Sequence, residues 1–210
     1  MVTCDFLVIG GGIIGISIVR ELKKRHPKSS QILIEKYVDF GIHASGRNSV
    51  VLHAGFYYTA NSFKAKFTQK GNQHLTEYCA SKNIPVNRCG KLVVAKNEVE
   101  LSQLDDLMAR AQANGVPMDS LTEKEAKNIE PRVKTFERAL FSPTTSSINP
   151  SAVVKAMVKD SIKEGIKMNS QVRYLKKLGD RIIKTSQGNI EFGYMVNAAG
   201  LYACLLYTSD

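Results

Sequence analysis

The chain has 210 residues, of which 43% are hydrophobic and 23% are charged, a balance that excludes disordered and fibrous classes and is typical of a globular protein. Its formal net charge of +10 favours anionic partners, but no basic stripe alternates with aromatic residues, so we expect no nucleic-acid partner. No apolar run reaches the roughly 18 residues that a membrane span requires, and the start of the chain lacks the basic region of a signal peptide. We therefore expect a cytoplasmic protein, with peripheral contact at an inner membrane left open.

The first fifty residues predict a β–turn–α–turn–β unit. Residues 4–9 form a short apolar run that is typical of a buried parallel strand. Glycines follow, and an apolar pattern then predicts a helix that ends near His26 and Pro27, where the proline stops it. Residues 31–35 predict a second buried strand.

The middle of the chain predicts helices separated by short strands. A helix is expected at 62–82, with an apolar side formed by Phe63, Phe67, Leu75 and Tyr78. Residues 91–96 predict a strand, and 98–114 predict a helix that ends at Gly115.

The last part of the chain combines two helix starts with further strands. Thr122 and Glu125 form a plausible capping box for a short helix before Pro131. Asn149 and Pro150 suit the N-cap and the first position of a helix that runs to Gly165. The predicted strands are a meander of three short strands over 171–191 and a last strand at 194–198.

These elements predict an α/β fold. Strands from both ends of the chain are expected to join one parallel sheet with a β-meander, in a discontinuous Rossmann-like domain of residues 1–84 and 146–203. Residues 85–145 are interpreted as part of an inserted α+β substrate domain.

The pattern G-x-G-x-x-G at Gly10, Gly12 and Gly15 directly follows the first strand. The first glycine permits a tight turn, the second lets the backbone approach a pyrophosphate, and the third lets helix and strand pack closely. The start of the helix, with Ile13 and Ile14, then faces the phosphates with free N–H groups and the positive end of its dipole. In this context the pattern predicts a dinucleotide site.

Glu35 stands twenty residues after Gly15, at the end of the second strand. An acidic residue in this place accepts hydrogen bonds from ribose hydroxyls and repels a 2′-phosphate, which disfavours NADP. We include the neighbouring Lys36 among the cofactor-binding residues.

The segment after the second strand favours FAD over NAD. Residues 41–58 are too rich in glycine and serine for a simple helix start. Their polar side chains suit hydrogen bonding to a pyrophosphate and to the edge of a flavin, although a solvated loop with a helix cap is the alternative. The candidates are Ser45, Arg47, Asn48 and Ser49.

The chain up to about Ala203 resembles the N-terminal half of the D-amino-acid-oxidase-like family of FAD enzymes. Within that family it is most similar to the L-2-hydroxyglutarate dehydrogenases and oxidases. Four stretches carry the likeness: S-G-R-N-S at 45–49 with H-A-G-F-Y-Y at 53–58, S-F-K-A-K at 62–66, C-G-K-L-V-V-A at 89–95, and N-A-A-G at 197–200.

The resemblance implies that the discontinuous domain binds FAD. It implies that Val172, where the meander opens, gives its backbone N–H and C=O to the adenine, and that Ala199 and Gly200 lie close to the cofactor. Two positions depart from the pattern: Val50 stands where the family usually has glycine, and Asn149 where related enzymes often have aspartate.

His53 is the candidate catalytic residue. Oxidation of a hydroxy acid requires a base for the hydroxyl proton while hydride passes to the flavin, and neutral histidine is a natural base near pH 7. His53 follows the flavin-binding stretch. A core histidine that bonds only to backbone is the alternative.

Two tyrosines and two lysines are candidates for substrate binding. Tyr57 and Tyr58 are expected to line the substrate side, and Lys64 and Lys91 to hold a carboxylate. Ordinary packing and surface positions are the alternatives. We expect no metal, because no group of histidine, cysteine and carboxylate residues has ligand spacing.

The resemblance implies FAD-dependent oxidation of L-2-hydroxyglutarate to 2-oxoglutarate, with electrons passed to a quinone or oxygen. A related amine or amino-acid oxidase or dehydrogenase is the alternative enzyme, and an inactive cofactor-binding fragment is the alternative from another class. We expect no activity from this chain by itself, because the resemblance covers about half of a family member. Residues 204–210 do not resemble the family's continuation and are expected to be a non-native tail.

Overall fold

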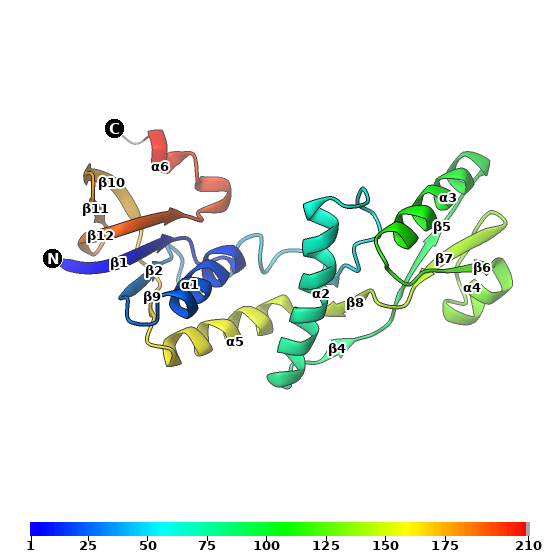
Figure 1. Ribbon diagram of the computed structural model, residues 1–210, viewed down its shortest axis with the longest axis horizontal. Coiled ribbons are helices and arrows are strands. Elements are labelled where there is room, and N and C mark those ends of the chain that lie inside the picture. Colours follow the sequence, from blue (N-terminus) through cyan, green and yellow to red (C-terminus); the bar gives the residue numbers. More distant parts are fainter. Residues whose placement is uncertain (209–210) are drawn as a thin grey trace. The chain divides into compact units, whose positions relative to one another are not determined.

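The chain forms two compact units in the computed structural model, which describes residues 1–208 (Figure 1). The first unit combines Met1–Asn48 with the residues from Pro150 onward, and the second is Ser49–Asn149. The expected domains, 1–84 with 146–203 and 85–145, have other limits. The assignment of one domain to the cofactor and the other to the substrate stays a prediction.

The first unit is built on a mixed six-stranded sheet. β1 (Val2–Ile9) pairs in parallel with both β2 (Gln31–Ile34) and β12 (Gly188–Asn197), which confirms that strands from the two ends of the chain share one sheet. In spatial order the strands are β10 (Tyr174–Gly179), β11 (Ile182–Thr185), β12 (Gly188–Asn197), β1 (Val2–Ile9), β2 (Gln31–Ile34) and β9 (Lys167–Asn169).

The end of the meander differs from the expectation. The sequence predicts a third meander strand ending near 191 and a separate strand at 194–198, whereas β12 runs without interruption through both. Gly193 lies between the two expected strands and belongs to β12. Its backbone approaches β1 closely, since a Cβ at Gly193 would lie 2.8 Å from the carbonyl oxygen of Asp5.

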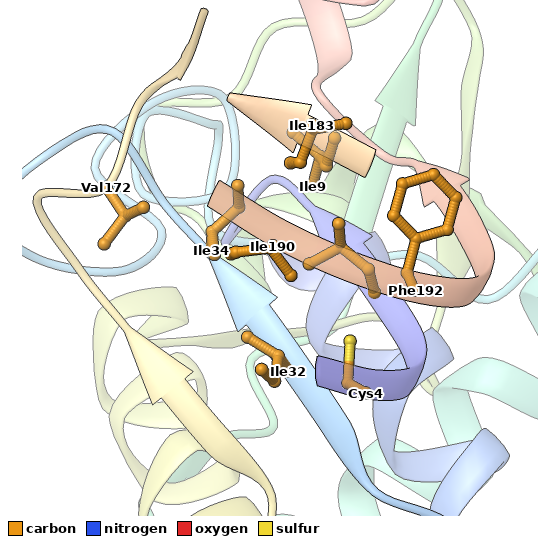
Figure 2. Close-up of a cluster of buried hydrophobic side chains, with 9 residues drawn as sticks. Cys4, Ile9, Ile32, Ile34, Val172, Ile183, Ile190 and Phe192 are labelled. Carbon is orange, nitrogen blue, oxygen red and sulfur yellow. The ribbon is translucent and has the colours of Figure 1, made fainter. Parts of the chain in front are cut away.

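Helices α1 (Ile13–Arg25) and α5 (Pro150–Lys163) cover one face of this sheet and contact each other. Ile16 and Val19 of α1 and Val154 of α5 pack there against Val8 and Leu33. Side chains alternate along a strand, so neighbouring strand residues form a second core on the opposite face (Figure 2). Its buried members are Cys4, Leu7, Ile9, Ile32, Ile34, Val172, Ile183, Ile190 and Phe192.

The second unit has two three-stranded sheets and three helices. The helices confirm the predicted ones, and α4 begins with the expected capping box of Thr122 and Glu125. Five of the six strands were not predicted, because runs of two to five residues carry little periodicity. The elements are α2 (Phe63–Ser81), α3 (Glu98–Ala113), α4 (Glu123–Ile129), β3 (Val51–Leu52), β4 (Val86–Asn87), β5 (Lys91–Val94), β6 (Asp119–Thr122), β7 (Arg138–Ser142) and β8 (Ser146–Ile148).

The apolar side predicted for α2 is wrong in its first half. Phe63 is 76% exposed and Phe67 69% exposed, and their rings stack on each other. The buried residues of this helix are Ala65 and Cys79. Asn72 lies on the same side, and its amide nitrogen donates to the carbonyl oxygens of residues 52, 53 and 144. A polar anchor therefore sets the rotation of the helix, which hydrophobic periodicity does not reveal.

Two remaining segments complete the description. Gly200–Tyr202 forms a 3-10 turn, and Leu205–Thr208 forms a short helix, α6. The expected non-native tail is 204–210, and its residues 209–210 lie outside the described residues. Among residues 1–208, no helix has the length and hydropathy needed to cross a membrane. In the same range, no group of three or more histidine, cysteine or acidic side chains gathers as metal ligands would.

Val50 adopts a backbone conformation that glycine enters more easily than valine. Its φ is +57°, in the left-handed region that β-branched residues rarely enter. Its carbonyl oxygen accepts the N–H of Ile148 at 3.0 Å. The second unit therefore carries backbone strain at its start.

We predict that Val50→Gly stabilises the second unit by about 0.5–1 kcal/mol. Replacing a left-handed non-glycine residue by glycine removes about 1–2 kcal/mol of strain from the folded state. Glycine also gives the unfolded chain more conformational freedom, which offsets about 0.5–1 kcal/mol of this gain in stability. Urea unfolding of the 210-residue chain measures the change. The control is Val99→Gly, at an exposed helical valine, which should destabilise by roughly 0.5 kcal/mol; a loss of stability at both positions would contradict the strain.

Candidate functional site

The turn between β1 and α1 is packed too tightly for any residue but glycine at two positions. Gly10 has a φ of +115°, and a Cβ there would lie 2.4 Å from the carbonyl oxygen of Ala198 at the end of β12. A Cβ at Gly15 would lie 2.0 Å from the carbonyl oxygen of Gly10. The glycines thus bring the start of α1 directly onto the carboxyl ends of β1 and β12.

The N-terminus of α1 is an anion-binding arrangement. The helix begins at Ile13, its N-cap Gly12 has no side chain, and its first turn contains no acidic residue. Ser45, from the loop after β2, accepts the N–H of Ile13 through its Oγ at 2.9 Å. The unpaired amides and the dipole of such a helix start attract a phosphate group, and Ser45 places a hydroxyl beside it.

Glu35 is anchored against the glycine turn. Its carboxylate accepts the N–H of Gly11 at 2.6 Å and the N–H of Tyr37 at 3.0 Å. A carboxylate has about four acceptor sites, so two remain for a pair of ribose hydroxyls. The backbone holds this carboxylate in place before any ligand arrives.

A cavity of about 530 Å³ in the first unit joins these groups, a size within the range of cofactor sites. Gly15 lies behind the turn and shapes it, and Ile13 contributes the N–H bound to Ser45. The predicted cofactor residues that line the cavity are Gly10, Gly12, Ile14, Glu35, Lys36, Ser45, Val172, Ala199 and Gly200.

Val172 lies beside Glu35, where the sequence predicts it. Its N–H donates to the carbonyl oxygen of Glu35 at 2.8 Å. This N–H is already engaged by the carbonyl of the residue that directly follows β2. The contact of Val172 with adenine stays a prediction.

Besides Ile13 and Gly15, three further predicted residues lie outside the cavity lining. Arg47 and Asn48 are exposed, and the amide nitrogen of Asn48 donates to the carbonyl oxygen of Ser45 at 2.9 Å. Ser49 belongs to the second unit. Their roles in binding the cofactor stay predictions.

Sequence reasoning missed an aromatic group on the cavity wall. Tyr37 and Tyr202 approach each other through their hydroxyls at 3.5 Å, His43 stacks on Tyr37, and the Lys36 ammonium lies over the Tyr202 ring. The hydrogen bond with Tyr37 and the nearby Lys36 lower the pKa of Tyr202, whereas the same bond raises the pKa of Tyr37. The only sequence signal was the position of the two tyrosines, close after Glu35 and Gly200.

The candidate catalytic residue lies in the second unit. His53 is half-buried, and burial together with the charge of Lys91 lowers its pKa below the usual value. The Lys91 ammonium lies over the ring of Tyr57, 4.7 Å from its centroid. The Lys64 ammonium lies 4.5 Å from the centroid of the Tyr58 ring. Four of the five predicted catalytic and substrate residues thus form two lysine–tyrosine pairs, and the lysine of one pair, Lys91, contributes to the lowered pKa of His53.

Comparison with known proteins identifies relatives along the whole described chain. The model of the DAO family, described as FAD dependent oxidoreductase, matches residues 5–209. The chain is 35% identical to the L-2-hydroxyglutarate dehydrogenase of Salmonella houtenae over 95% of its length, and 32% identical to the mitochondrial L-2-hydroxyglutarate dehydrogenase of Homo sapiens over 95%. It covers 48% and 46% of these two proteins, so the chain spans a little under half the length of the curated relatives that it matches.

Solved structures share the fold. The L-proline dehydrogenase of P. horikoshii matches with a TM-score of 0.88 and 23% sequence identity. The match covers 99% of this chain and 56% of the length of that dehydrogenase. The L-α-glycerophosphate oxidase of Mycoplasma pneumoniae, solved with FAD bound, matches with a TM-score of 0.85 and 25% sequence identity. The match covers 96% of this chain and 55% of the length of that oxidase.

The residues of the first unit fit an FAD molecule. The glycine turn packs the start of α1 against the end of β12, α1 has no acidic residue in its first turn, and Glu35 retains acceptor sites for a ribose. The family match over residues 5–209 agrees with this chemistry. The chain belongs to the DAO family of FAD-dependent oxidoreductases, and it is related to the L-2-hydroxyglutarate dehydrogenases.

Proposed function

We propose that the whole protein oxidises L-2-hydroxyglutarate to 2-oxoglutarate and passes the electrons to a quinone or oxygen. The support from relatives is the 32–36% identity to L-2-hydroxyglutarate dehydrogenases over 82–95% of the chain. The structural observation that carries the proposal is that Lys91 lies over the ring of Tyr57 and close enough to the half-buried His53 for its charge to lower the histidine pKa. His53 is a base for the hydroxyl proton of a hydroxy acid, and Lys91 is a cation for its carboxylate.

The first unit would hold the cofactor. The N-terminal amides of α1 and the Ser45 hydroxyl bind the pyrophosphate, Glu35 binds the adenosine ribose, and the Val172 carbonyl faces the adenine. Bound FAD supplies the acceptor for the substrate hydride. The apolar Ile14 and the backbone of Ala199 and Gly200 line the same cavity and restrict water.

The second unit would handle the proton and the substrate charge. Neutral His53 takes the proton of the substrate hydroxyl at an imidazole nitrogen, which requires the unprotonated form. Lys91 attracts one carboxylate and also disfavours protonation of His53. Lys64, paired with Tyr58, offers a second ammonium for the other carboxylate. A dicarboxylic hydroxy acid uses both cations, whereas a monocarboxylic amino acid uses one.

We predict that Lys91→Gln raises the pKa of His53. Removal of a nearby positive charge favours the imidazolium, so the shift is upward. Burial, the larger cause of the depression, remains, so the pKa stays below the usual histidine value. NMR titration of the histidine ring protons in the 210-residue chain measures it. Lys96→Gln, which removes an exposed lysine of the same unit, is the control and should leave the titration unchanged. An equal change of the His53 pKa in the two variants would show that Lys91 has no specific effect on His53.

We predict that L-2-hydroxyglutarate reduces the flavin when the chain is joined to the C-terminal half of an L-2-hydroxyglutarate dehydrogenase, which restores the length of its relatives. The visible absorbance of oxidised flavin should disappear under anaerobic conditions, because hydride transfer to the cofactor is the step tested. The D-enantiomer, L-proline and glycine are the controls and should leave the flavin oxidised.

The unextended chain serves as a second control, and we expect it to stay oxidised with every substrate. Reduction by L-proline or glycine alone would assign the protein to the amino-acid oxidases instead. Reduction of the unextended chain by L-2-hydroxyglutarate would show that residues 1–210 already form a working site.

A further inference from the structure

A second hollow in the first unit lies away from the glycine turn. It is an apolar groove of about 290 Å³ between helix α5 and the loop at Asp39 and Phe40. Val154, Val158 and Ile162 of α5 form its apolar wall, and Ile162 is 57% exposed. Nothing in the proposed oxidation uses this groove.

The groove is formed in advance by close packing. Phe40 belongs to the core cluster that contains Val154 and Val158. Gly41, next in the loop, has a φ of +71°, and a Cβ there would lie 2.9 Å from Cγ1 of Val154. Its N–H donates to the carbonyl oxygen of Gly11 at 2.9 Å. The loop is therefore held against the helix at one end and against the glycine turn at the other.

A row of lysines borders the groove. Lys155, Lys159 and Lys163 line it at intervals of four residues along α5, so they face the same side over about 12 Å. All three are exposed, and none forms an ion pair within residues 1–208. Their mutual repulsion is left uncompensated inside the chain.

The acidic residues nearby make contacts away from this row. Asp160 and Glu164 of α5 approach Arg20 on α1, at 3.7 and 3.6 Å. Asp39, the one acidic residue among those that line the groove, accepts the N–H of Phe40 at 2.8 Å. The border of the groove thus has a net charge of about +2, from three ammonium groups and one carboxylate.

We propose that this groove is a docking site for an acidic amphipathic helix of a partner protein. The spacing of the lysines, one helical turn apart, matches acidic residues spaced in the same way on a facing helix. The concave apolar wall accepts a protruding leucine or phenylalanine between the charges. A lipid surface fits less well, because it requires apolar side chains that protrude, and here Phe40 and Val158 are recessed.

The test uses a synthetic helical peptide as the probe, because no partner is identified. Its apolar face carries leucines, its flank carries three glutamates one turn apart, and a fluorophore reports binding to the 210-residue chain by anisotropy. Lys155→Glu, Lys159→Glu and Lys163→Glu combined should weaken binding by about tenfold or more, since each attraction becomes a repulsion. The same peptide with lysines in place of glutamates should bind this triple variant better than it binds the original chain.

A matched control changes the same charge elsewhere in the first unit. Lys28→Glu, Lys176→Glu and Lys184→Glu combined alter three exposed lysines outside the groove and should leave binding within about twofold, an effect of net charge alone. Ile162→Ala, at an exposed side chain that tolerates truncation, should weaken binding without any change of charge, and it replaces the triple variant if that variant fails to fold.

Two results would overturn the proposal. If the groove variant and the control variant lose peptide binding equally, the peptide responds to the net charge of the chain and not to the groove. Binding of phosphatidylserine vesicles that depends on Lys155, Lys159 and Lys163, without binding of the peptide, would identify the surface as a lipid contact. Neither result depends on FAD or on oxidation of any substrate, so the proposed function is tested separately.

Discussion

The close approach of the glycine turn to the end of β12 is the constraint on which the first unit depends. Gly10 touches the carbonyl of Ala198, and Gly15 touches the carbonyl of Gly10. A side chain at either position would push α1 away from the sheet. The same contact that packs the helix also places its first amides at the carboxyl edge of the strands, where we propose that the phosphates bind.

This contact also explains why the site is built from distant parts of the chain. The parallel pairing of Ile9 with Asn197 brings the segment around Ala198 next to the glycine turn. The N–H bond from Val172 to Glu35 brings the start of the meander to the end of β2. The chain's own hydrogen bonds thus hold Glu35 at the glycine turn, Val172 at the end of β2 and Ser45 at the start of α1.

The sequence predicted those structural elements that depend on interactions between residues close together in the chain. The β1–α1–β2 unit, the capping box at Thr122 and the helix start at Pro150 follow from neighbouring residues, and the structure confirms them. Tertiary contacts decided the rest. β12 continues through Gly193 where it pairs along the whole of β1, and Asn72 of α2 bonds to carbonyls of residues 52 and 144. The pairing of Tyr37 with Tyr202 joins residues 165 positions apart, and no spacing rule in one sequence predicts it.

The central claim is that the start of α1 binds the pyrophosphate of FAD. Amide hydrogen exchange in the 210-residue chain, measured by NMR with and without ligand, tests it directly, because the first amides of a helix have no intrahelical partner to protect them. Addition of FAD or ADP should slow exchange at Gly12 and Ile14, and riboflavin, which has no pyrophosphate, should not. Bound FAD that leaves these two amides exchanging at their original rates would contradict the claim.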